Sequence, residues 1–389
     1  MKSIPPGAWL GLLGGGQLGR MFCMAAQSLG YKVVVLDPGA HSPAGSVADH
    51  HVRADYLDAA GLAELAARAA AATTEFENVP AAALEFLART ARVTPAAASV
   101  AIAQDRIREK NFLNDHGFAV APFAVLENEA QTHGVASNLI PGIVKSARFG
   151  YDGKGQVRVS GRDSVAAAWR SMNGGPCVIE QLVSLACEVS VIVARNEHGD
   201  TRSWPVAENR HRDGILDVSI VPARVADALA MQARDIAVRV AHALDYRGVL
   251  CVELFVTRDG TLLVNEIAPR PHNSGHYTID ACVTSQFEQQ ARVLADLPLG
   301  DTRQHTPSVM VNLLGDIWFA DAGDTTAREP AWRSVLAHGE AKLHLYGKAE
   351  ARRGRKMGHV TCLGATLDEA LDTARAVKRA LRIPGADEF

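Results

Sequence analysis

The sequence predicts an α/β fold in three units: an N-terminal doubly wound parallel sheet, a small α+β lid and a C-terminal α+β domain. Three observations carry this prediction. Strands and helices alternate through the first 100 residues, a glycine-rich loop joins two strands near residue 150, and a hairpin with opposed glutamates lies between residues 248 and 267. We expect an N-terminal domain over residues 1–100, a central domain over 101–300 with the lid at about 117–178, and a C-terminal domain over 301–389.

The chain opens with a strand, a glycine turn and a helix. Trp9 to Leu13 is a short apolar run, Gly14 to Gly19 turns into a helix, and Lys32 to Leu36 is the next strand. This order matches the GxGxxG fingerprint of dinucleotide-binding folds, with Asp37 placed to hold a ribose hydroxyl. The fingerprint alone is weak, because any phosphorylated ligand can use such a helix N-terminus and a tight turn can also bind nothing.

The alternation continues to residue 90. Helices are predicted at Asp58 to Ala71 and Ala81 to Thr90, around a strand at Thr73 to Phe76. Alternating strands and helices imply parallel pairing. Because polar residues after the strands of such a sheet line the ligand crevice, Glu75 and Glu77 are candidates to contact a ligand.

The segment Ser99 to His116 is predicted as one helix. Its charged residues, among them Arg106 and Lys110, are typical of a solvated helix face.

A glycine-rich flap follows. Gly142 to Ser146 is predicted as a strand with Lys145 embedded in it, and Val157 to Val159 as its partner. The connecting loop holds three glycines among Tyr, Asp and Lys. This composition favours a flap whose amides close on phosphates, with Lys145 as a point charge, over a plain flexible hairpin.

Two further strands carry candidate ligand contacts. After a helix at Asp163 to Met172, the strand Cys177 to Val183 becomes polar at its end, as in a hinge that presents backbone groups to adenine. Glu188, in the strand Cys187 to Val193, is placed to pair with a ribose hydroxyl. His211 lies near a turn at residues 213–214, where a lone histidine is more often a surface residue than a ligand.

A hairpin supplies the first geometric argument for a metal site. Gly248 to Val256 and Thr261 to Ile267 are strand-like, and Asp259-Gly260 between them suits a two-residue type I′ turn. In that register Arg258 faces Thr261 and Glu253 faces Glu266. Opposed carboxylates lie about 5 Å apart at Cβ and repel unless a cation or a proton intervenes. Mg²⁺ bridging to phosphates fits this pair, and two solvated glutamates are the alternative.

The stretch Val264 to His276 is unusually rich in polar chemistry. It contains Asn265 and Glu266 at a strand end, and then four polar residues on a proline-stiffened loop, namely Arg270, His272, Asn273 and Ser274. Such density is rarely structural, so the stretch predicts a binding or catalytic loop.

The C-terminal part predicts three strands and a last helix. The strands are Met310 to Leu314, Lys342 to Tyr346 and Val360 to Leu363, and Thr366 is the N-cap of the helix. The basic run Arg352 to His359 leads into the third strand, and its glycines favour a phosphate-facing loop over a nucleic-acid patch.

The composition fits a small-molecule enzyme. Forty basic and 43 acidic residues give a net charge of −3, so no global field attracts nucleic acid or membrane. The six cysteines show no CxxC spacing, which favours free thiols in a reducing compartment over zinc ligation. The chain begins without a signal-peptide pattern and lacks a run of about 20 apolar residues. We therefore expect a cytoplasmic enzyme without a nucleic-acid or membrane partner.

Six runs of the chain carry a family resemblance: Gly14–Met21, Thr74–Pro80, Gly150–Gln156, Asn265–His276, Ser285–Gln289 and Arg355–His359. In the expected order over nearly the whole chain, they resemble the ATP-grasp family, and within it the branch that carboxylates 5-aminoimidazole ribonucleotide in purine biosynthesis. One departure is Gln290, where that branch has histidine.

The resemblance implies a reaction and its cofactor. ATP, bicarbonate and 5-aminoimidazole ribonucleotide would give ADP, phosphate and the N5-carboxylated nucleotide by way of carboxyphosphate. Mg²⁺, or Mn²⁺ in its place, would be held by Glu253 and Glu266, and the enzyme would be a homodimer. The N-terminal glycine turn would then serve the ribose phosphate of the substrate, so Asp37 need not bind a cofactor.

The resemblance also implies roles for individual residues. Asp152 would be the base that takes a proton from the amine or the bicarbonate. The other implied catalytic residues are Arg270, His272 and Lys348. The implied ATP ligands are Arg106, Lys145, Gly150, Tyr151, Asp152, Gly153, Lys154, Gly155, Gln156, Glu180, Gln181, Leu182, Val183, Glu188, His211, Asn265 and Glu266. The implied ligands of the ribonucleotide are Gly16, Gln17, Leu18, Glu75, Tyr151, Asp152, Arg270, His272, Asn273, Ser274, Lys348 and Arg355.

Three alternatives stay open at this point. A formate-using ribonucleotide transformylase is the nearest ATP-grasp competitor. An NAD-dependent oxidoreductase and a catalytically silent nucleotide-binding regulator belong to different classes.

Overall fold

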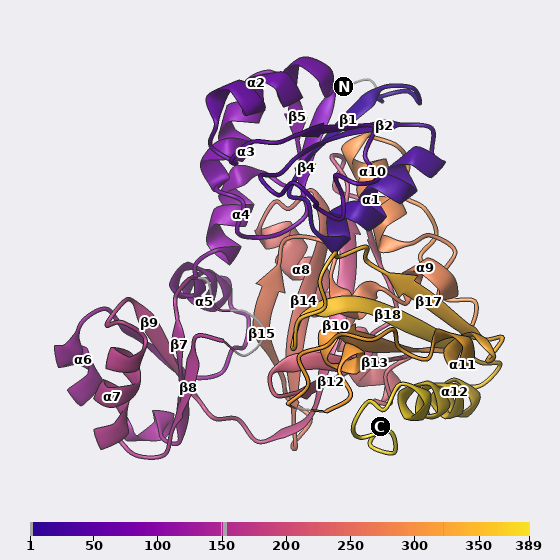
Figure 1. Cartoon of the computed structure of the whole chain (residues 1–389). Coiled ribbons are helices and arrows are strands. Elements are labelled where there is room, and N and C mark those ends of the chain that lie inside the picture. Colours follow the sequence, from indigo (N-terminus) through magenta and orange to yellow (C-terminus); the bar gives the residue numbers. More distant parts are fainter. Residues whose placement is uncertain (1–2, 149, 151–153, 322) are drawn as a thin grey trace.

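The computed structural model describes residues 3–148, 150, 154–321 and 323–389. Three β-sheets organise these residues (Figure 1). The N-terminal sheet lies at the top of that view, a four-stranded sheet projects at the lower left, and a nine-stranded sheet forms the body. None of the helices in the described part of the chain is long and apolar enough to cross a membrane.

The N-terminal sheet confirms the predicted doubly wound topology. Its strand order is β3-β2-β1-β4-β5, and every neighbouring pair is parallel. The strands are β1 Trp9–Leu13, β2 Lys32–Leu36, β3 His50–Val52, β4 Ala71–Thr74 and β5 Arg92–Val93. The helices are α1 Gln17–Ser28, α2 Ala59–Arg68 and α3 Ala81–Leu87. The strand order changes direction between β1 and β4, and their carboxyl ends lead into the glycine turn and Glu75.

The single helix predicted over residues 99–116 is wrong, because the structure has two helices there. These are α4 Ala97–Ala103 and α5 Arg106–Asp115. The side chain of Asp105 accepts hydrogen bonds from the backbone amides of Ile107 and Arg108 and so caps the second helix. The cap makes α5 an independent element that can turn its charged face away from solvent.

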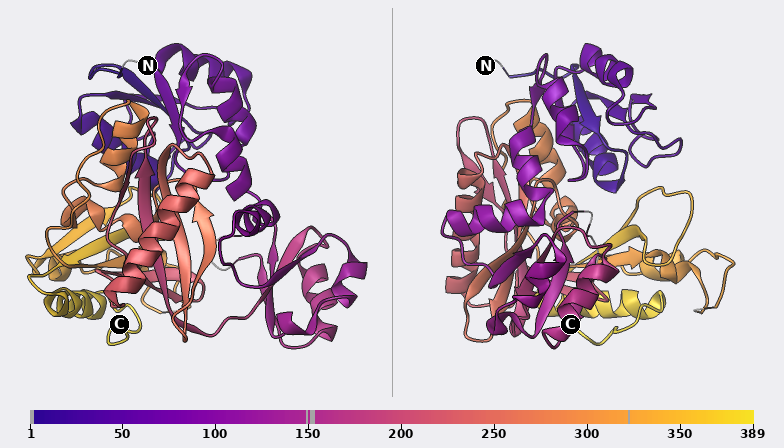
Figure 2. Two further views of the ribbon diagram at one scale, coloured as in Figure 1. Left: turned by 180° about the vertical axis from the view of Figure 1, so that it is seen from behind. Right: turned by 90° about the vertical axis from the view of Figure 1, so that its left-hand side faces the viewer.

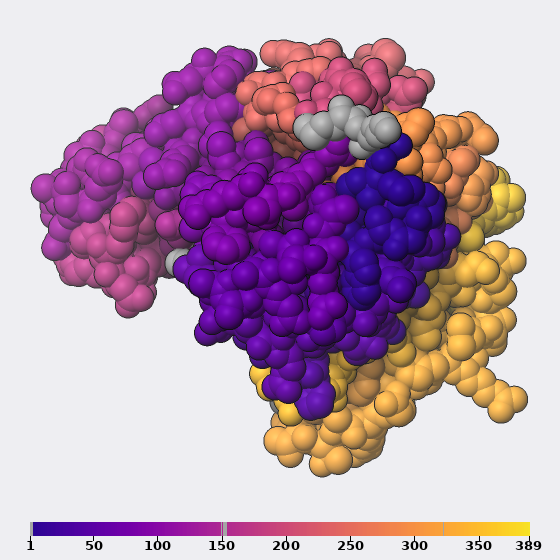
Figure 3. Space-filling model, turned by 90° about the horizontal axis from the view of Figure 1, so that it is seen from above, coloured from indigo at the N-terminus to yellow at the C-terminus, as the bar shows by residue number. Residues whose placement is uncertain are grey.

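The projecting unit is a four-stranded antiparallel sheet with strand order β6-β9-β7-β8. Its strands are β6 Phe123–Leu126, β7 Gly142–Ser146, β8 Gln156–Val159 and β9 Cys177–Gln181. Two helices, α6 Glu129–His133 and α7 Asp163–Ser171, and the 3-10 turn Ser137–Leu139 pack with it. Seen from above, this unit extends away from the N-terminal unit on one side, and the C-terminal residues emerge on the other (Figure 3).

The body is one antiparallel sheet with strand order β15-β14-β10-β12-β13-β16-β18-β17, and β11 pairs with β10. Strand β13 pairs with β16, so the C-terminal strands extend the central sheet. The strands are β10 Leu185–Arg195, β11 Thr201–Ser203, β12 Ala207–Arg212, β13 Ile215–Val221, β14 Gly248–Thr257, β15 Leu262–Ala268, β16 Ser308–Leu314, β17 Ala341–Leu345 and β18 Lys356–Leu363. The domain boundaries given above stay a prediction.

Helices cover this sheet with small and branched apolar side chains. Ala233, Ala237 and Val240 of α8 Asp227–Ala243 belong to the same buried cluster as β10 and β14, and Figure 2 shows α8, in salmon, across the rear face. Ala374 and Val377 of α12 pack on β16 and β18. The other helices are α9 Thr278–Ala281, α10 Gln286–Leu294, α11 Trp332–Leu336 and α12 Leu367–Ala380, with 3-10 turns at Asn273–Gly275 and Gly315–Trp318.

Candidate active site

The β14–β15 hairpin places Glu253 opposite Glu266, as predicted, but through a different turn. Thr257 and Thr261 form the closing pair, with the Thr257 amide donating to the Thr261 carbonyl at 3.0 Å. The loop therefore has three residues, Arg258 to Gly260, and the predicted two-residue turn with Arg258 facing Thr261 is wrong. Gly260 has φ +83, the left-handed conformation that such a loop requires.

A β-bulge restores the register that the longer loop changed. Leu254 pairs with Val264, whereas Glu253 pairs with Glu266, so Asn265 is an extra residue in β15. Without the bulge, Glu253 would pair with Asn265. The sequence argument reached the correct pair of glutamates because two one-residue errors cancel.

Each of the two glutamates contacts a different basic side chain. Glu266 Oε2 lies 3.2 Å from Arg106 Nη2, and Glu253 Oε1 lies 3.0 Å from His272 Nε2. Burial alone would raise the pKa of Glu253, but its contact with His272 and the nearby His211 and Arg270 lower it. The side-chain oxygen of Asn265 is buried and has no hydrogen-bond partner among the described residues. Two carboxylates and an unused amide oxygen form a set that suits a hard cation such as Mg²⁺.

Helix α5 brings three charged residues to this hairpin at spacing i, i+3, i+4, and their predicted solvated face is wrong. Arg106 contacts Glu266, the Glu109 carboxylate accepts from the Ile267 amide at 2.6 Å, and Lys110 Nζ donates to the Asn265 carbonyl at 3.0 Å. Lys110 is 0% exposed and Glu109 3% exposed. Burial raises the pKa of Glu109 to about 7. The helical spacing of the three charges was the signal that sequence reasoning missed.

Lys145 of the projecting sheet meets the same group of charges. Its Nζ lies 2.9 Å from Glu180 Oε2, and Lys110 Nζ lies 3.6 Å from the same oxygen. Burial would raise the pKa of Glu180, but the two lysines lower it. Glu180 Oε1 and Arg106 Nη1 are buried without partners in the described part of the chain. These atoms retain hydrogen-bonding capacity for a ligand.

His211 is exposed, as expected from sequence, and it is also a partner of Glu188. Its Nδ1 lies 3.1 Å from Glu188 Oε2. Burial would lower the pKa of His211, but Glu188, Glu253 and Glu266 raise it. The turn at Asp213-Gly214 is confirmed, since both residues have positive φ between β12 and β13.

The loop after the hairpin meets the crevice of the N-terminal sheet. Arg270 forms a close ion pair with Glu77, which follows β4. Burial would raise the pKa of Glu77, but Arg270 lowers it to about 2. A cavity of about 60 Å³ lies here, lined by residues from the N-terminal crevice, α5 and the hairpin: Glu77, Gln104, Arg106, Glu109, Glu266 and Arg270.

The N-terminal glycine turn is occupied by carboxylates of the same chain. Glu75 accepts from the Gly16 amide at 2.7 Å and the Gly19 amide at 3.1 Å. Asp37 accepts from the Gly15 amide at 2.8 Å and the Tyr56 hydroxyl at 2.7 Å. A Cβ atom at Gly16 would lie 2.4 Å from Glu75 Oε1, so a larger residue there would displace the Glu75 carboxylate. A surface with Glu75 at its centre suits a hydroxyl better than bare phosphate.

The basic loop between β17 and β18 faces helix α1. Lys348 Nζ donates to the Lys356 carbonyl and lies 5.7 Å from the Tyr346 ring centroid. Arg355 Nη1 donates to the Glu350 carbonyl at 2.8 Å. The adjacent Gly347 approaches Arg20 of α1, whose Nη1 would lie 3.3 Å from a Cβ atom at that position. The loop therefore brings the basic run next to the N-terminal unit.

Part of the predicted flap lies outside the described residues, namely Phe149, Tyr151, Asp152 and Gly153. Gly155, at its far end, has φ +70, and its carbonyl accepts from the Ser146 amide at 2.8 Å. The strands β7 and β8 pair in register Lys145 to Gln156, as a flap requires.

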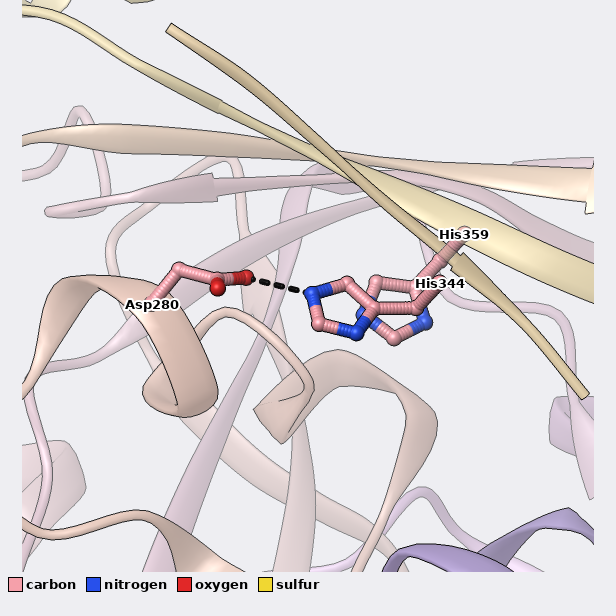
Figure 4. Close-up of side chains that lie close together, drawn as sticks. All are labelled: Asp280, His344 and His359. Carbon is pink, nitrogen blue, oxygen red and sulfur yellow. Dashed lines mark hydrogen bonds and ion pairs between the residues drawn. The ribbon is translucent and has the colours of Figure 1, made fainter. Parts of the chain in front are cut away.

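A histidine cluster lies outside the predicted site. Asp280 pairs with His344 at 2.8 Å, and His359 lies behind His344 (Figure 4). One ligand atom from each of the three residues lies within 4.8 Å of the others. The two imidazoles are stacked, with centroids 4.5 Å apart and planes at 13°. Lone pairs of parallel rings do not converge on one point, so the cluster is packed as a hydrogen-bonded pair on a ring stack and not as a metal centre.

The chain matches known protein families along most of its length. Three family models match in order: Ribonucleotide synthetase preATP-grasp domain at residues 8–104, ATP-grasp domain at 111–287, and Phosphoribosylaminoimidazole carboxylase C-terminal domain at 308–373. The N5-carboxyaminoimidazole ribonucleotide synthase of Brucella melitensis is 48% identical over 362 residues, which cover 92% of this chain and 97% of that protein.

Solved structures agree with this similarity. An ADP complex of an N5-carboxyaminoimidazole ribonucleotide synthetase matches with a TM-score of 0.90 at 42% identity, covering 97% of this chain and 98% of that chain. The N5-carboxyaminoimidazole synthase of Aspergillus clavatus, in complex with ADP and 5-aminoimidazole ribonucleotide, matches with a TM-score of 0.88 at 32% identity, covering 97% and 99%.

Proposed function

Since the chain belongs to the N5-carboxyaminoimidazole ribonucleotide synthase family of ATP-grasp ligases, we propose that the residues around the β14–β15 hairpin form its active site. The chain is an ATP-dependent ligase of purine biosynthesis that carboxylates 5-aminoimidazole ribonucleotide. The observation that carries the site is the pairing of Glu253 with Glu266 beside Arg106.

Mg²⁺ is the cofactor that we propose for this pair, with Mn²⁺ as a substitute. Glu253 and Glu266 would hold the ion, and the unpartnered Asn265 oxygen supports a polar ligand at the bulge. The ion would neutralise charge on the phosphates, which is the main requirement of phosphoryl transfer.

ATP is placed between the projecting sheet and the body in this proposal. Lys145 and Arg106 hold the phosphates, and the loop 150–156 closes over them, including Gly150, Lys154, Gly155 and Gln156. The end of β9, from Glu180 through Gln181 and Leu182 to Val183, holds adenine. Glu188 holds the ribose with His211 beside it, and their 3.1 Å ion pair supports that shared role.

The reaction that we propose begins with attack of a bicarbonate oxygen on the γ-phosphorus. The bond from that phosphorus to the β,γ-bridging oxygen breaks, which gives carboxyphosphate and ADP. Carboxyphosphate releases carbon dioxide and phosphate, and the substrate amine forms the new C–N bond while a base takes its proton. Asp152 is the proposed base, and Arg270 and Lys348 hold the carboxyl intermediate. The implied role of His272 is corrected, because its two ring nitrogens contact Glu253 and Ser274 and it supports Glu253 instead.

The ribonucleotide is proposed to bind between the N-terminal crevice and the basic loop. Glu75 accepts from ribose hydroxyls beside Gly16, Gln17 and Leu18, and Lys348 and Arg355 hold the phosphate. Arg270 and Asn273 complete this side with Tyr151. Ser274 does not take the substrate role that the resemblance implies, because it is 0% exposed and bonded to His272 and Ser190. The Arg270–Glu77 ion pair supports the contact between the hairpin loop and the crevice.

The decisive experiment measures ADP release with each of the three substrates omitted in turn. We expect full rate only with ATP, bicarbonate and 5-aminoimidazole ribonucleotide together. Full rate with formate in place of bicarbonate would indicate a transformylase. Tight NAD(P)H binding would support the alternative of an NAD-dependent oxidoreductase. ADP release that needs neither bicarbonate nor the ribonucleotide would contradict the proposal.

A homodimer is also proposed. An apolar groove of about 460 Å³ between α1, α10 and β17 supports it, because Met24, Val283 and Leu345 at this groove are all exposed. Light scattering on the purified chain would give twice the mass of 41.5 kDa, and a monomer mass would reject it.

A further inference from the structure

A row of buried polar side chains leads from Glu253 into the centre of the nine-stranded sheet. The residues come from four strands and the loop after the hairpin. The links are His272 Nε2 to Glu253 Oε1 at 3.0 Å, His272 Nδ1 to Ser274 Oγ at 2.8 Å, Ser274 Oγ to Ser190 Oγ at 2.7 Å, Asn209 Nδ2 to Ser190 Oγ at 2.8 Å, and Ser219 Oγ to Asn209 Oδ1 at 2.8 Å.

The backbone amide of Ser274 sets the direction of every bond. It lies 3.4 Å from His272 Nδ1, and because an amide can only donate, Nδ1 accepts and carries no hydrogen. A ring with a bare Nδ1 carries its hydrogen on Nε2, which lies 3.0 Å from Glu253 Oε1 and donates to that carboxylate.

Each remaining hydrogen then has one position. The Ser274 hydroxyl donates to His272 Nδ1, so the Ser274 oxygen accepts from the Ser190 hydroxyl. The Ser190 oxygen accepts from the Asn209 amide nitrogen, and the Asn209 oxygen accepts from Ser219. The opposite His272 tautomer would point a lone pair at the Glu253 carboxylate. The Ser190 oxygen would then accept from both Ser274 and Asn209, and the Ser190 hydrogen would have no acceptor in the row unless the Asn209 amide were flipped.

The row fixes the orientation of His272 and does not conduct protons. Ser190, Ser274 and Ser219 are 1%, 0% and 0% exposed, and Asn209 is 5% exposed. The row therefore ends inside the sheet at Ser219, and a proton that entered at His272 would have no bulk water to reach there. Fixed direction in a buried network is a means of positioning one side chain.

We propose that Ser274, Ser190 and Asn209 are positioning residues that hold His272 in its Nε2–H tautomer and thereby orient the Glu253 carboxylate toward the cation. The orientation of Glu253 toward a cation rests on the proposed function, whereas the tautomer of His272 does not. Groups that orient a metal ligand in this way commonly change metal affinity by about 10-fold or more when removed.

The first test measures the tautomer. Long-range ¹H–¹⁵N spectra of protein labelled with ¹⁵N-histidine distinguish a protonated ring nitrogen from a bare one, and the His272→Gln variant identifies the His272 signals. We expect a protonated Nε2 and a bare Nδ1 in the wild type. A protonated Nδ1 with a bare Nε2 would overturn the proposal.

The second test compares Ser190→Ala with Ser308→Ala. Ser308, on β16 of the same sheet, is also 0% exposed, and its hydroxyl has no partner among the described residues. We expect Ser190→Ala to weaken Mg²⁺ activation of ADP release by about 10-fold, with a smaller change in the KM for ATP and the same melting temperature as Ser308→Ala. Ser190→Thr, which keeps the hydroxyl, should restore the Mg²⁺ dependence.

The outcomes separate the two claims. A wild-type Mg²⁺ dependence in Ser190→Ala would refute the positioning role while ADP release by the wild type still stood. Loss of Mg²⁺ activation in Ser308→Ala as well would show a general packing effect and would also refute it. Absence of ribonucleotide-dependent ADP release in the wild type would remove the proposed function but leave the tautomer measurement valid.

Discussion

Replacing Arg270 with alanine tests whether the contact between the hairpin loop and the N-terminal crevice is as strong as its burial indicates. Arg270 and Glu77 form an ion pair in which the two side chains are 16% and 26% exposed. Arg270 is the principal group that lowers the pKa of Glu77 from 4.5 to about 2, against the effect of burial. At about 1.36 kcal/mol per pKa unit, this difference corresponds to about 3 kcal/mol of stability.

A double-mutant cycle measures this coupling. The variants are Arg270→Ala, Glu77→Gln and the double variant, and the assay is urea unfolding followed by circular dichroism. We expect each single variant to lose about 3 kcal/mol, because its former partner stays buried without a counter-charge, and the double variant to lose less than the sum. The matched control is the exposed pair Arg170–Glu129, 61% and 48% exposed, for which about 0–1 kcal/mol of coupling is expected.

The pH dependence has a definite sign. The pKa of Glu77 is lower in the folded chain than in the unfolded chain, so its stabilisation is fully present above pH 4.5 and is lost as the pH falls toward 2. The coupling should therefore shrink over that window. Additive single variants at pH 7, or coupling that grows on acidification, would refute the reasoning.

Three other outcomes are expected. Glu266→Gln should abolish turnover by weakening Mg²⁺ binding, and a wild-type rate at ordinary Mg²⁺ in the ADP-release assay would reject the hairpin site. Arg355→Ala should raise the KM for the ribonucleotide much more than the KM for ATP, and an ATP-selective defect would contradict its phosphate role. Gln290, which is 5% exposed, donates to the Thr73 hydroxyl and the Thr74 carbonyl, so Gln290→Ala should cost about 1–3 kcal/mol in urea unfolding. Kinetic constants that changed while stability did not would contradict this structural role.

Local sequence patterns were sufficient to predict many of the helices and strands. The bounds of β1, β2 and β7 agree with their predicted ranges, and Thr366 caps α12 as expected, since its side chain accepts from the Glu369 amide. Each of these elements depends on signals within a few residues, such as an apolar run or a capping residue. The parallel order of the N-terminal sheet also followed, because short alternating elements leave few topologies.

The candidate site was predicted less completely, because its contacts join distant segments. Sequence reasoning placed Lys110 on a solvated face, yet Lys110 lies against Glu180 and Asn265. It found Glu253 opposite Glu266 but not the bulge at Asn265 that makes the pairing. The bulge lies where α5 contacts the hairpin, with Lys110 donating to the Asn265 carbonyl and Glu109 accepting from the Ile267 amide, and no local sequence pattern records these contacts.

By itself, then, the sequence determined the order of elements and the chemical types in each motif, because propensity, caps and glycine turns act over short distances. Only the tertiary structure decided which charges share one environment. Burial between α5, the hairpin and the projecting sheet makes Glu180 and Lys110 an interior ion pair, and burial of Ser274 and Ser190 turns two common hydroxyls into a directed row behind His272. Burial depends on elements far apart in the chain, and it is burial that makes a polar side chain costly unless it is paired.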